Sequence, residues 1–483
     1  MLKKGVSFFL IFSFCVLLNF PVDATQSDYT YEITDNSVKI IKYTGSEESV
    51  DIPPSIEGKT VAEISQFAFT DCEAVSINIP AGVEKIGVEA FESCKKLQSV
   101  TVDSNNKHYA SVLGVLYDKG INELIYFPAA RGGEYSVSSV VKKIGMYAFA
   151  DCVNLTSVTL PSGVEEIADS AFTGCKNLQK VTISESAEIQ SIGVHAFSDC
   201  TSLKIITIPS NVGFIGDYAF YGCTSLEKIN VNSDNKTFSS EDGVLFDKNK
   251  TTIIFYPYNK NGAYIIPVSV KIIGYQAFLN CKKLTSITIP DGVHTISEGA
   301  FQGCQKLTEV KLPQSIKTIG SLAFSDCTSL KKINIPDGIE EIPFCTFMGC
   351  KSLQSIQIPN SVKELGRFSF SDCTSLTLIY IPNSVETIGF RTLYNCPKAV
   401  VHCFYGSAAY DYVTENDYGY KLLDNFEINE DFTLKDAVCV LKHVANIEMI
   451  EKGELFDLYD ITKDGKIELI DAVLILQAVA RIL

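Results

Sequence analysis

Hydrophobic and polar positions follow one order that returns about every 23 residues along most of the chain. Each unit has Val or Ile three positions before Ile or Leu, then Phe three positions before Cys and Leu three positions after it. The unit ends in I/V-x-I/L-P, as in residues 314–336, QSIKTIGSLAFSDCTSLKKINIP. The final alternation predicts a short strand with every second side chain facing inward. Pro ends that strand because it cannot donate to a β-ladder.

A ladder of twelve cysteines marks the same position in successive units, and most of its steps are 23 residues long. The ladder consists of Cys72, Cys94, Cys152, Cys175, Cys200, Cys223, Cys281, Cys304, Cys327, Cys350, Cys373 and Cys396. A fixed period of this length predicts a solenoid, here of about 12 coils. One unit cannot bury its own apolar face, whereas stacked units align equivalent side chains in continuous buried columns.

The same alignment decides how the cysteines are interpreted. Phe keeps its position in eleven of the twelve units, from Phe69 to Phe370, and Leu393 replaces it in the last. Sixteen cysteines in an exported chain would ordinarily favour disulfides, but pairing would break the equivalence of the units. We therefore interpret the ladder as small buried side chains. Cys345, Cys403 and Cys439 lie outside it, and the sequence leaves their redox state open.

These repeated positions closely resemble the BspA-type, or Treponema-type, leucine-rich repeats of bacterial surface proteins, over roughly residues 50–420. The resemblance implies a leucine-rich-repeat β-solenoid. It also implies a role in adhesion and protein binding, with no general association with catalysis.

Two steps of 58 residues interrupt the period and hold related insertions, VDSNNKHYASVLGVLYDK from Val102 and VNSDNKTFSSEDGVLFDK from Val231. They lie 129 residues apart, as do flanking cysteines, which indicates duplication of a larger block. We expect hairpin-like extensions at about 103–137 and 232–266 of a solenoid spanning 59–405. Because a solenoid has open ends, strand-like residues 25–58 are a candidate N-terminal cap. A short helix at 407–416 is expected within a C-terminal cap and linker, 406–423.

Residues 1–24 have the features of a secretory signal peptide. Lys3 and Lys4 precede an apolar run from Val6 to Phe20, and Val22-Asp23-Ala24 fits a cleavage site. A membrane anchor is the alternative, but the run is short for a spanning helix, which needs about 20 residues. We expect a secreted protein with no membrane insertion after cleavage.

The strands are expected to present a mostly polar face, because the residues between buried aliphatic positions point outward. That face either binds a partner or is only a solvated sheet surface, since Thr and Ser suit exposed strands. Leu378 and Tyr380, which share one strand, form the best candidate contact with a protein or glycan ligand. The other expected outward residues are Ser157, Thr159, Lys180, Thr182, Ile205, Lys228, Asn230, Ser286, Thr288, Glu309, Lys311, Lys332, Asn334, Ser355 and Gln357.

After about residue 424 the period stops, and residues 460–471 (DITKDGKIELID) match the start of an EF-hand calcium loop. This spacing places hard oxygen ligands around one Ca²⁺ ion, and Gly465 permits the sharp turn. Thr462 replaces the usual Asn or Asp, which weakens one ligand. The candidate ligands are Asp460, Thr462, Asp464, Lys466 through its carbonyl, Glu468 and Asp471.

A related segment, 425–436 (NFEINEDFTLKD), lies 35 residues earlier, and an apolar helix-like stretch follows each loop. This duplicated arrangement in residues 424–483 resembles a type I dockerin, a small all-α module that binds cohesin domains of cellulosome-type scaffolds. A second ion stays in question, because Glu430 stands where Gly is expected and a bulky residue with positive φ is costly. The candidate ligands of the first loop are Asn425, Glu427, Asn429 and Asp436.

The resemblance also implies which dockerin residues would meet the cohesin. They correspond to Leu469 and Ile470 in the second half and to Leu434 and Lys435 in the first. The Leu469–Ile470 pair either docks on the partner or packs locally, and the sequence does not separate these alternatives.

Composition narrows the function further. A net charge of −16 opposes nucleic-acid binding, and the absence of Trp disfavours a sugar-binding platform. None of the five His residues lies in a catalytic motif. We expect a secreted, non-catalytic adhesion protein held on a scaffold by calcium-dependent dockerin–cohesin binding, with a link to polysaccharide degradation. The alternatives are a free-standing adhesin with a stabilising tail and a polysaccharide hydrolase.

Overall fold

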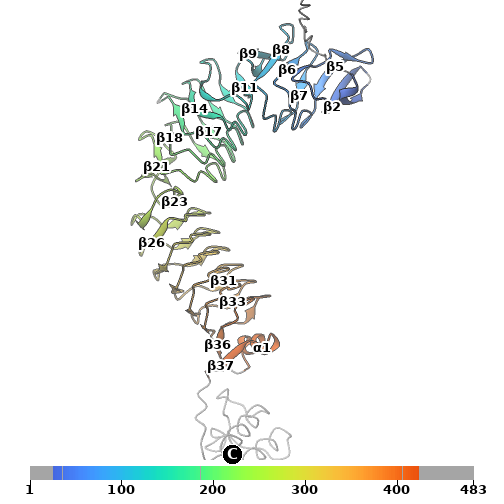
Figure 1. The fold of residues 1–483 in the computed structure, drawn as a ribbon. Coiled ribbons are helices and arrows are strands. Elements are labelled where there is room, and N and C mark those ends of the chain that lie inside the picture. The colour runs from blue at the N-terminus through green and yellow to red at the C-terminus, as the bar shows by residue number, and fades with distance from the viewer. Residues whose placement is uncertain (1–25, 35, 185, 405, 424–483) are drawn as a thin grey trace, which may run out of the picture. The chain divides into compact units, whose positions relative to one another are not determined.

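The computed structural model describes residues 26–34, 36–184, 186–404 and 406–423. The chain divides into two compact units, residues 1–261 and 262–483, called unit 1 and unit 2 below. Each unit consists of coils of the predicted solenoid, drawn as stacked turns in Figure 1.

The elements of unit 1 are one 3₁₀ helix and short strands. They are η1 (Gln26–Asp28), β1 (Tyr29–Ile33), β2 (Ser37–Tyr43), β3 (Ser49–Asp51), β4 (Ser55–Ile56), β5 (Lys59–Ile64), β6 (Ser76–Ile79), β7 (Lys85–Ile86), β8 (Ser99–Val102), β9 (Tyr109–Val112), β10 (Val115–Asp118), β11 (Glu123–Tyr126), β12 (Gly133–Ser136), β13 (Lys143–Ile144), β14 (Leu155–Leu160), β15 (Glu166–Ile167), β16 (Lys180–Ile183), β17 (Ser191–Ile192), β18 (Ile205–Ile208), β19 (Phe214–Ile215), β20 (Lys228–Val231), β21 (Phe238–Glu241), β22 (Val244–Asp247) and β23 (Thr252–Phe255).

The elements of unit 2 are short strands and one α-helix near the end of the described chain. They are β24 (Gly262–Ile265), β25 (Ile272–Ile273), β26 (Leu284–Thr288), β27 (Thr295–Ile296), β28 (Glu309–Val310), β29 (Thr318–Ile319), β30 (Lys332–Ile333), β31 (Glu341–Ile342), β32 (Ser355–Gln357), β33 (Glu364–Leu365), β34 (Leu378–Tyr380), β35 (Thr387–Ile388), β36 (Val400–Cys403), α1 (Ala408–Glu415) and β37 (Gly419–Leu422).

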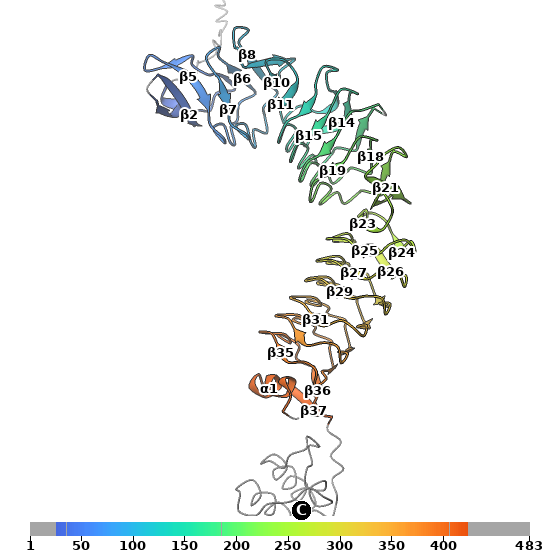
Figure 2. The ribbon, with the colours of Figure 1, turned by 180° about the vertical axis from the view of Figure 1, so that it is seen from behind.

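Each regular coil contributes one strand of two residues and a second strand of two to six residues, and equivalent strands of most successive coils pair in parallel. In unit 1 the order β13-β15-β17-β19 gives a short row, and β12-β14-β16-β18-β20 gives a long row. In unit 2, β31-β33-β35 and β32-β34-β36-β37 repeat this arrangement. Within unit 2 the short strands β31 and β33 lie along one edge, away from β26 (Figures 1 and 2).

The predicted Phe column forms the core of each unit. In unit 2 the rings of Phe301, Phe324 and Phe347 stack at centroid distances of 5.3 and 5.6 Å, with interplanar angles of 9° and 5°. The Phe amides bind the next coil as well: Phe324 N–H donates to the carbonyl of Thr346, 2.9 Å away. A buried ring and a satisfied amide thus recur at each step from Phe278 to Phe370.

The cysteine ladder does more than fill space. The Cys327 thiol donates to the carbonyl of Phe301 in the preceding coil, with an Sγ–O distance of 3.2 Å. Most other ladder thiols make the same contact, as Cys350 does with Phe324 at 3.2 Å. The thiol is a second, weak donor to a carbonyl that already accepts an amide of its own coil, as the Phe301 carbonyl accepts the Cys304 amide at 3.2 Å. The prediction that the ladder cysteines are buried and form no disulfides is confirmed for the described residues.

A second column, two positions after most residues of the Phe column, largely alternates between Asp or Asn and Gly. Asp326 has φ 55° and Gly349 φ 72°, and a Cβ on Gly349 would lie 2.4 Å from Asp326 Oδ1. The same relation joins Asp151 to Gly174 and Asp199 to Gly222. The carboxylate of one coil therefore occupies the space that the next coil's glycine leaves open.

The prediction of about 12 coils is wrong, because the structure has about 17 turns. The cysteine count misses turns that lack Cys. Tyr43 takes the Phe position of an early turn and donates its amide to Ala68, and Phe127 does the same toward Ala148. The Phe127 ring stacks on Phe149 at 5.0 Å, so the first insertion adds a turn as well as a hairpin.

Each insertion begins with antiparallel strands, β9 with β10 and β21 with β22. A buried Asn fixes its first turn: Asn106 Nδ2 donates to the carbonyls of Pro80 and Val83, and Oδ1 accepts the amides of His108 and Tyr109. Asn235 makes the same four bonds in the second insertion. Sequence analysis missed this role, although both insertions carry the Asn before Lys.

The last described coil ends in the expected helix. Ser407 is the N-cap of α1, and its side chain accepts the amide of Tyr410. Ala409 and Val413 are the buried residues of this helix. The Tyr412 hydroxyl accepts the Leu393 amide at 3.1 Å. α1 therefore covers apolar surface of the final coil.

Candidate binding surfaces

The longer strands expose the predicted outward side chains. In β14, for example, Ser157 and Thr159 are half-buried and exposed, whereas Val158 between them is buried. Every outward residue named from the sequence is exposed or half-buried, because the strand alternation holds in each coil.

Leu378 and Tyr380 lie on β34, on the outward side as predicted, and parallel pairing extends their patch. Leu378 is in register with Val400, and each has 37% of its surface exposed. Tyr380 is half-buried rather than exposed, because its ring contacts Phe404 edge-on at a centroid distance of 6.5 Å. Sequence analysis missed Val400, whose position beside Leu378 depends on the register.

A shallow hollow of about 490 Å³ adjoins this patch. Lys332, Asn334, Ser355 and Gln357 line it together with Tyr380. Asn334 is already used within the fold, because its side chain accepts the Leu312 amide and donates to the Leu312 carbonyl. The hollow offers a mostly polar floor beside an apolar rim, which is a suitable arrangement for a peptide segment.

Unit 1 has a different feature where the first insertion begins. Here β7 pairs with β5, whereas β9, β10 and β11 begin a separate sheet that continues into β13. The Phe91 ring still meets Tyr126 at 5.1 Å, but in the described chain no bond joins the Phe91 amide to the next coil. At this point of the stack lies a cavity of about 320 Å³. Its lining includes residues 86–93 together with Tyr109, Tyr126 and Met146.

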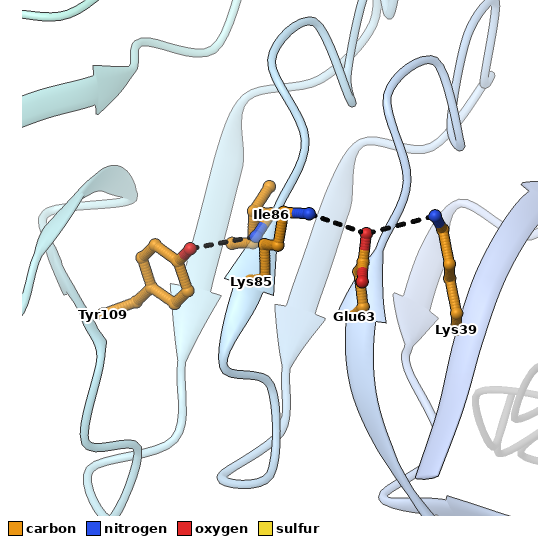
Figure 3. A network of polar contacts seen from close by, with 5 residues as sticks. All are labelled: Lys39, Glu63, Lys85, Ile86 and Tyr109. Carbon is orange, nitrogen blue, oxygen red and sulfur yellow. Dashed lines mark hydrogen bonds and ion pairs between the residues drawn. The ribbon is translucent and has the colours of Figure 1, made fainter. Parts of the chain in front are cut away.

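The contact between Tyr109 and Ile86 lies at the wall of this cavity, and an ion-pair network of Lys39, Glu63 and Lys85 lies beside it (Figure 3). The Tyr109 hydroxyl accepts the Ile86 amide at 2.9 Å, so it caps the strand β7. Glu63 bridges Lys39 and Lys85, with both Nζ–Oε1 distances 3.2 Å. These lysines lower the pKa of Glu63 against the effect of its partial burial.

Another part of the lining is acidic. Glu89, Glu92 and Asp151 border the cavity, and partial burial together with the two neighbouring carboxylates raises the pKa of Glu92. The potential at this rim therefore favours a cation over an anion.

The buried thiols have low reactivity as nucleophiles. Burial raises the pKa of Cys175, Cys304 and Cys327 well above the ordinary thiol value. Cys345 and Cys403, which lie off the ladder, are also buried, and burial and Asp326 raise the pKa of Cys345 to about 11. A protonated, inaccessible thiol is a poor nucleophile.

The comparisons with known proteins agree with this architecture. The sequence matches the family described as the BspA type leucine rich repeat region in six copies, over residues 34–112, 133–250 and 271–400, which together span more than half of the chain. The chain belongs to the BspA-type leucine-rich-repeat family. No curated protein matches the sequence.

Solved structures of leucine-rich-repeat chains are similar. A leucine rich cell surface protein of Faecalibacterium prausnitzii is 28% identical, with 83% of this chain and 99% of that chain covered and a TM-score of 0.51. A leucine-rich repeat protein of Eubacterium ventriosum is 30% identical over 57% and 82% of the two chains, with a TM-score of 0.46. One of Bacteroides ovatus is 26% identical over 84% and 100%, with a TM-score of 0.49.

BspA-type proteins are cell-surface proteins of a non-enzymatic family, and no catalytic family matches this chain. In the part of the chain that the structure describes, no helix has the length and apolar character to span a bilayer. Within the same residues, no group of three or more His, Cys, Asp and Glu side chains could hold a metal ion.

The predicted calcium module falls outside the described residues. This applies to the candidate ligands Asn425, Glu427, Asn429, Asp436, Asp460, Thr462, Asp464, Lys466, Glu468 and Asp471. It applies equally to the candidate cohesin contacts Leu434, Lys435, Leu469 and Ile470.

Proposed function

We propose that this BspA-type chain is a non-catalytic binding protein of the cell surface that holds a protein ligand on the strand face of unit 2. The supporting observation is the patch of Leu378 and Val400 beside the polar hollow at Tyr380. Apolar side chains at the centre of a polar face are typical of binding surfaces.

The strand face can be tested with peptides selected from a phage-displayed library against the full chain. Leu378→Ser with Val400→Ser should weaken the selected peptides by about ten-fold or more, as loss of a central contact does. Ile205→Ser is the matched control, because Ile205 is also an outward aliphatic residue on a strand, 46% exposed. Equal binding by both variants and the native chain would exclude the patch as the ligand surface.

We further propose that residues 424–483 attach the protein to a scaffold through calcium-dependent binding of a cohesin domain. The support is the spacing of oxygen-bearing residues from Asp460 to Asp471, with Gly465 at the turn, and the related segment 425–436. Calcium would act by ordering the module, because an unfolded loop has no preformed site.

Asp460→Ala with Asp471→Ala removes the first and last ligands of the second loop. Binding to a panel of cohesins should be lost in this variant and, for the native chain, after chelation. Circular dichroism of the repeats should stay unchanged. Glu451→Ala with Glu454→Ala makes the same change in charge between the two loops and should bind normally. Failure of the native chain to bind any cohesin would favour the free-standing adhesin, and turnover of polysaccharides would favour the hydrolase.

A further inference from the structure

A cluster of aromatic and arginine side chains lies at the surface of unit 2, after the short strands β31, β33 and β35. It consists of Phe344, Arg367, Phe368, Phe390, Arg391 and Tyr394, called the aromatic–arginine surface below. Phe390 is 61% exposed, and Phe344 and Tyr394 are 47% exposed each. Phe368 joins the two flanking phenylalanines by edge-to-face contacts, at 6.3 Å from Phe344 and 5.9 Å from Phe390.

The repeat itself shows that the fold does not require these side chains. They occupy the positions three before, two before and one after the residue of the Phe column. Around Phe324, one coil earlier, the same positions hold Ser321, Leu322 and Ser325. Around Phe301 they hold Glu298, Gly299 and Gln302.

Phe301, Phe324, Phe347 and Phe370 nevertheless stack alike, at 5.3 to 5.6 Å. The exposed rings therefore add nothing to the column. A contiguous exposed apolar patch on a soluble surface marks an interaction site.

The arginines give this surface its charge. The chain has only four Arg residues, at 131, 367, 391 and 481, against a net charge of −16. The Arg391 guanidinium lies over two rings, 4.9 Å from the Phe390 centroid and 4.8 Å from that of Tyr394. A planar guanidinium held on aromatic faces keeps its N–H edge available for a carboxylate.

Neither arginine has an ion-pair partner among residues 262–404 and 406–423. A positive group set in an aromatic patch of an otherwise acidic chain is complementary to an anionic, aromatic segment.

We propose that the aromatic–arginine surface binds an acidic peptide segment of a partner protein that carries aromatic side chains. Carboxylates of the segment pair with Arg367 and Arg391, while its rings pack against Phe344, Phe390 and Tyr394. This site uses other residues than the strand face, so either can fail while the other stands.

The test uses the full chain and three labelled polymers of matched length: a random glutamate–tyrosine copolymer, polyglutamate and an uncharged glutamine–tyrosine copolymer. Fluorescence anisotropy should show binding of the glutamate–tyrosine copolymer and much weaker binding of the other two. Added salt should weaken the interaction, because screening reduces the contribution of the arginines.

Variants then locate the site. Phe390→Ser with Arg391→Leu installs the residue types that the coil around Phe324 carries at these positions, and it should weaken binding by about ten-fold or more. Arg391→Lys keeps the charge but loses the planar stacking, and should give a smaller loss. Ser321→Ala with Glu298→Gln, in the neighbouring coils, is the control and should bind as the native chain does.

Unfolding temperatures of all variants are measured in parallel to show that the fold is retained. Equal affinity for polyglutamate, native affinity of the Phe390→Ser/Arg391→Leu variant, or no binding by the native chain would overturn the proposal.

Discussion

The two units are built from the same coil but differ in where they vary. From Cys281 to Cys396 every step of the ladder in unit 2 is 23 residues, and the Phe rings stack without interruption. Unit 1 has steps of 22, 23, 25 and 58 residues. Its ladder of Phe amides breaks at Phe91, where the cavity opens.

This difference shows two ways in which a solenoid can acquire a site. An insertion changes the stacking itself, so it creates a hollow with a buried wall, as at Tyr109 and Tyr126. A regular stack keeps its core and changes only the outward positions, as at Leu378 or Phe390. The second way leaves the core untouched, because each coil contacts only its neighbours.

The largest expected effect is a loss of folding stability at alkaline pH. If the cysteine ladder is equivalent in the two units, this loss should occur in both. Burial raises the pKa of Cys200 in unit 1 and Cys327 in unit 2, so above about pH 9 the unfolded thiol loses its proton while the folded thiol keeps it. Stability is then complete below that pH and falls as pH rises, with each thiol contributing up to about 1.4 kcal/mol per pH unit.

Urea unfolding between pH 8 and 10, followed by circular dichroism, measures this slope. Cys200→Ala and Cys327→Ala should each flatten it by about one thiol. A slope that neither substitution changes would mean that other groups cause the alkaline loss.

Substituting Ala for a Phe of the column should cost more stability in unit 2 than in unit 1. Phe324→Ala removes a fully buried ring from a tight stack and should cost about 4 kcal/mol. Phe91→Ala should cost at least about 1 kcal/mol less, because Phe91 already borders the cavity and has fewer contacts to lose.

Urea unfolding gives both values, and Phe390→Ala, at an exposed ring, should stay within about 0.5 kcal/mol of the native chain. Equal losses for Phe91 and Phe324 would show that the cavity does not relieve the stack in unit 1.

The Asp–Gly column should give the smallest difference. Gly349→Ala places a Cβ 2.4 Å from Asp326 Oδ1 at φ 72°, whereas Gly406→Ala has φ 68° and no atom within 4 Å. Gly406→Ala should cost about 1 kcal/mol from its backbone conformation alone, and Gly349→Ala about 1 kcal/mol more.

Gly174→Ala in unit 1 should cost slightly more than Gly349→Ala, because its Cβ would lie 2.1 Å from Asp151 Oδ1, closer than the 2.4 Å at Gly349. Thermal unfolding orders the three variants. The reverse order for Gly174 and Gly349 would contradict this account of the column.

Much of the repeat could be predicted from its period. A Phe, a Cys and a Leu recurring at one spacing have to be buried together, since no single unit can cover them. The outward positions of the strands, including Leu378, followed from the alternation. The turns without Cys were not predicted, because Tyr43 and Phe127 continue the aromatic column in turns that lack a ladder cysteine.

The sites were harder to predict. Phe344, Phe368 and Phe390 do not stand out among the 29 Phe residues of the sequence. Only the structure shows that they are exposed or half-buried beside the column residue. The cavity at Phe91 was also beyond prediction, because it depends on which strand the insertion pairs with. The calcium loops remain a prediction.

By itself the sequence determined the solenoid, its period, its buried columns and its polar strand face, because periodic burial is a local property of each coil. Only the tertiary structure decided which residues of different coils become neighbours. Register brings Val400 beside Leu378, pairing of the first insertion opens a cavity, and stacking places Arg391 over two rings. These contacts depend on how successive coils are superposed, and a one-dimensional pattern does not contain that information.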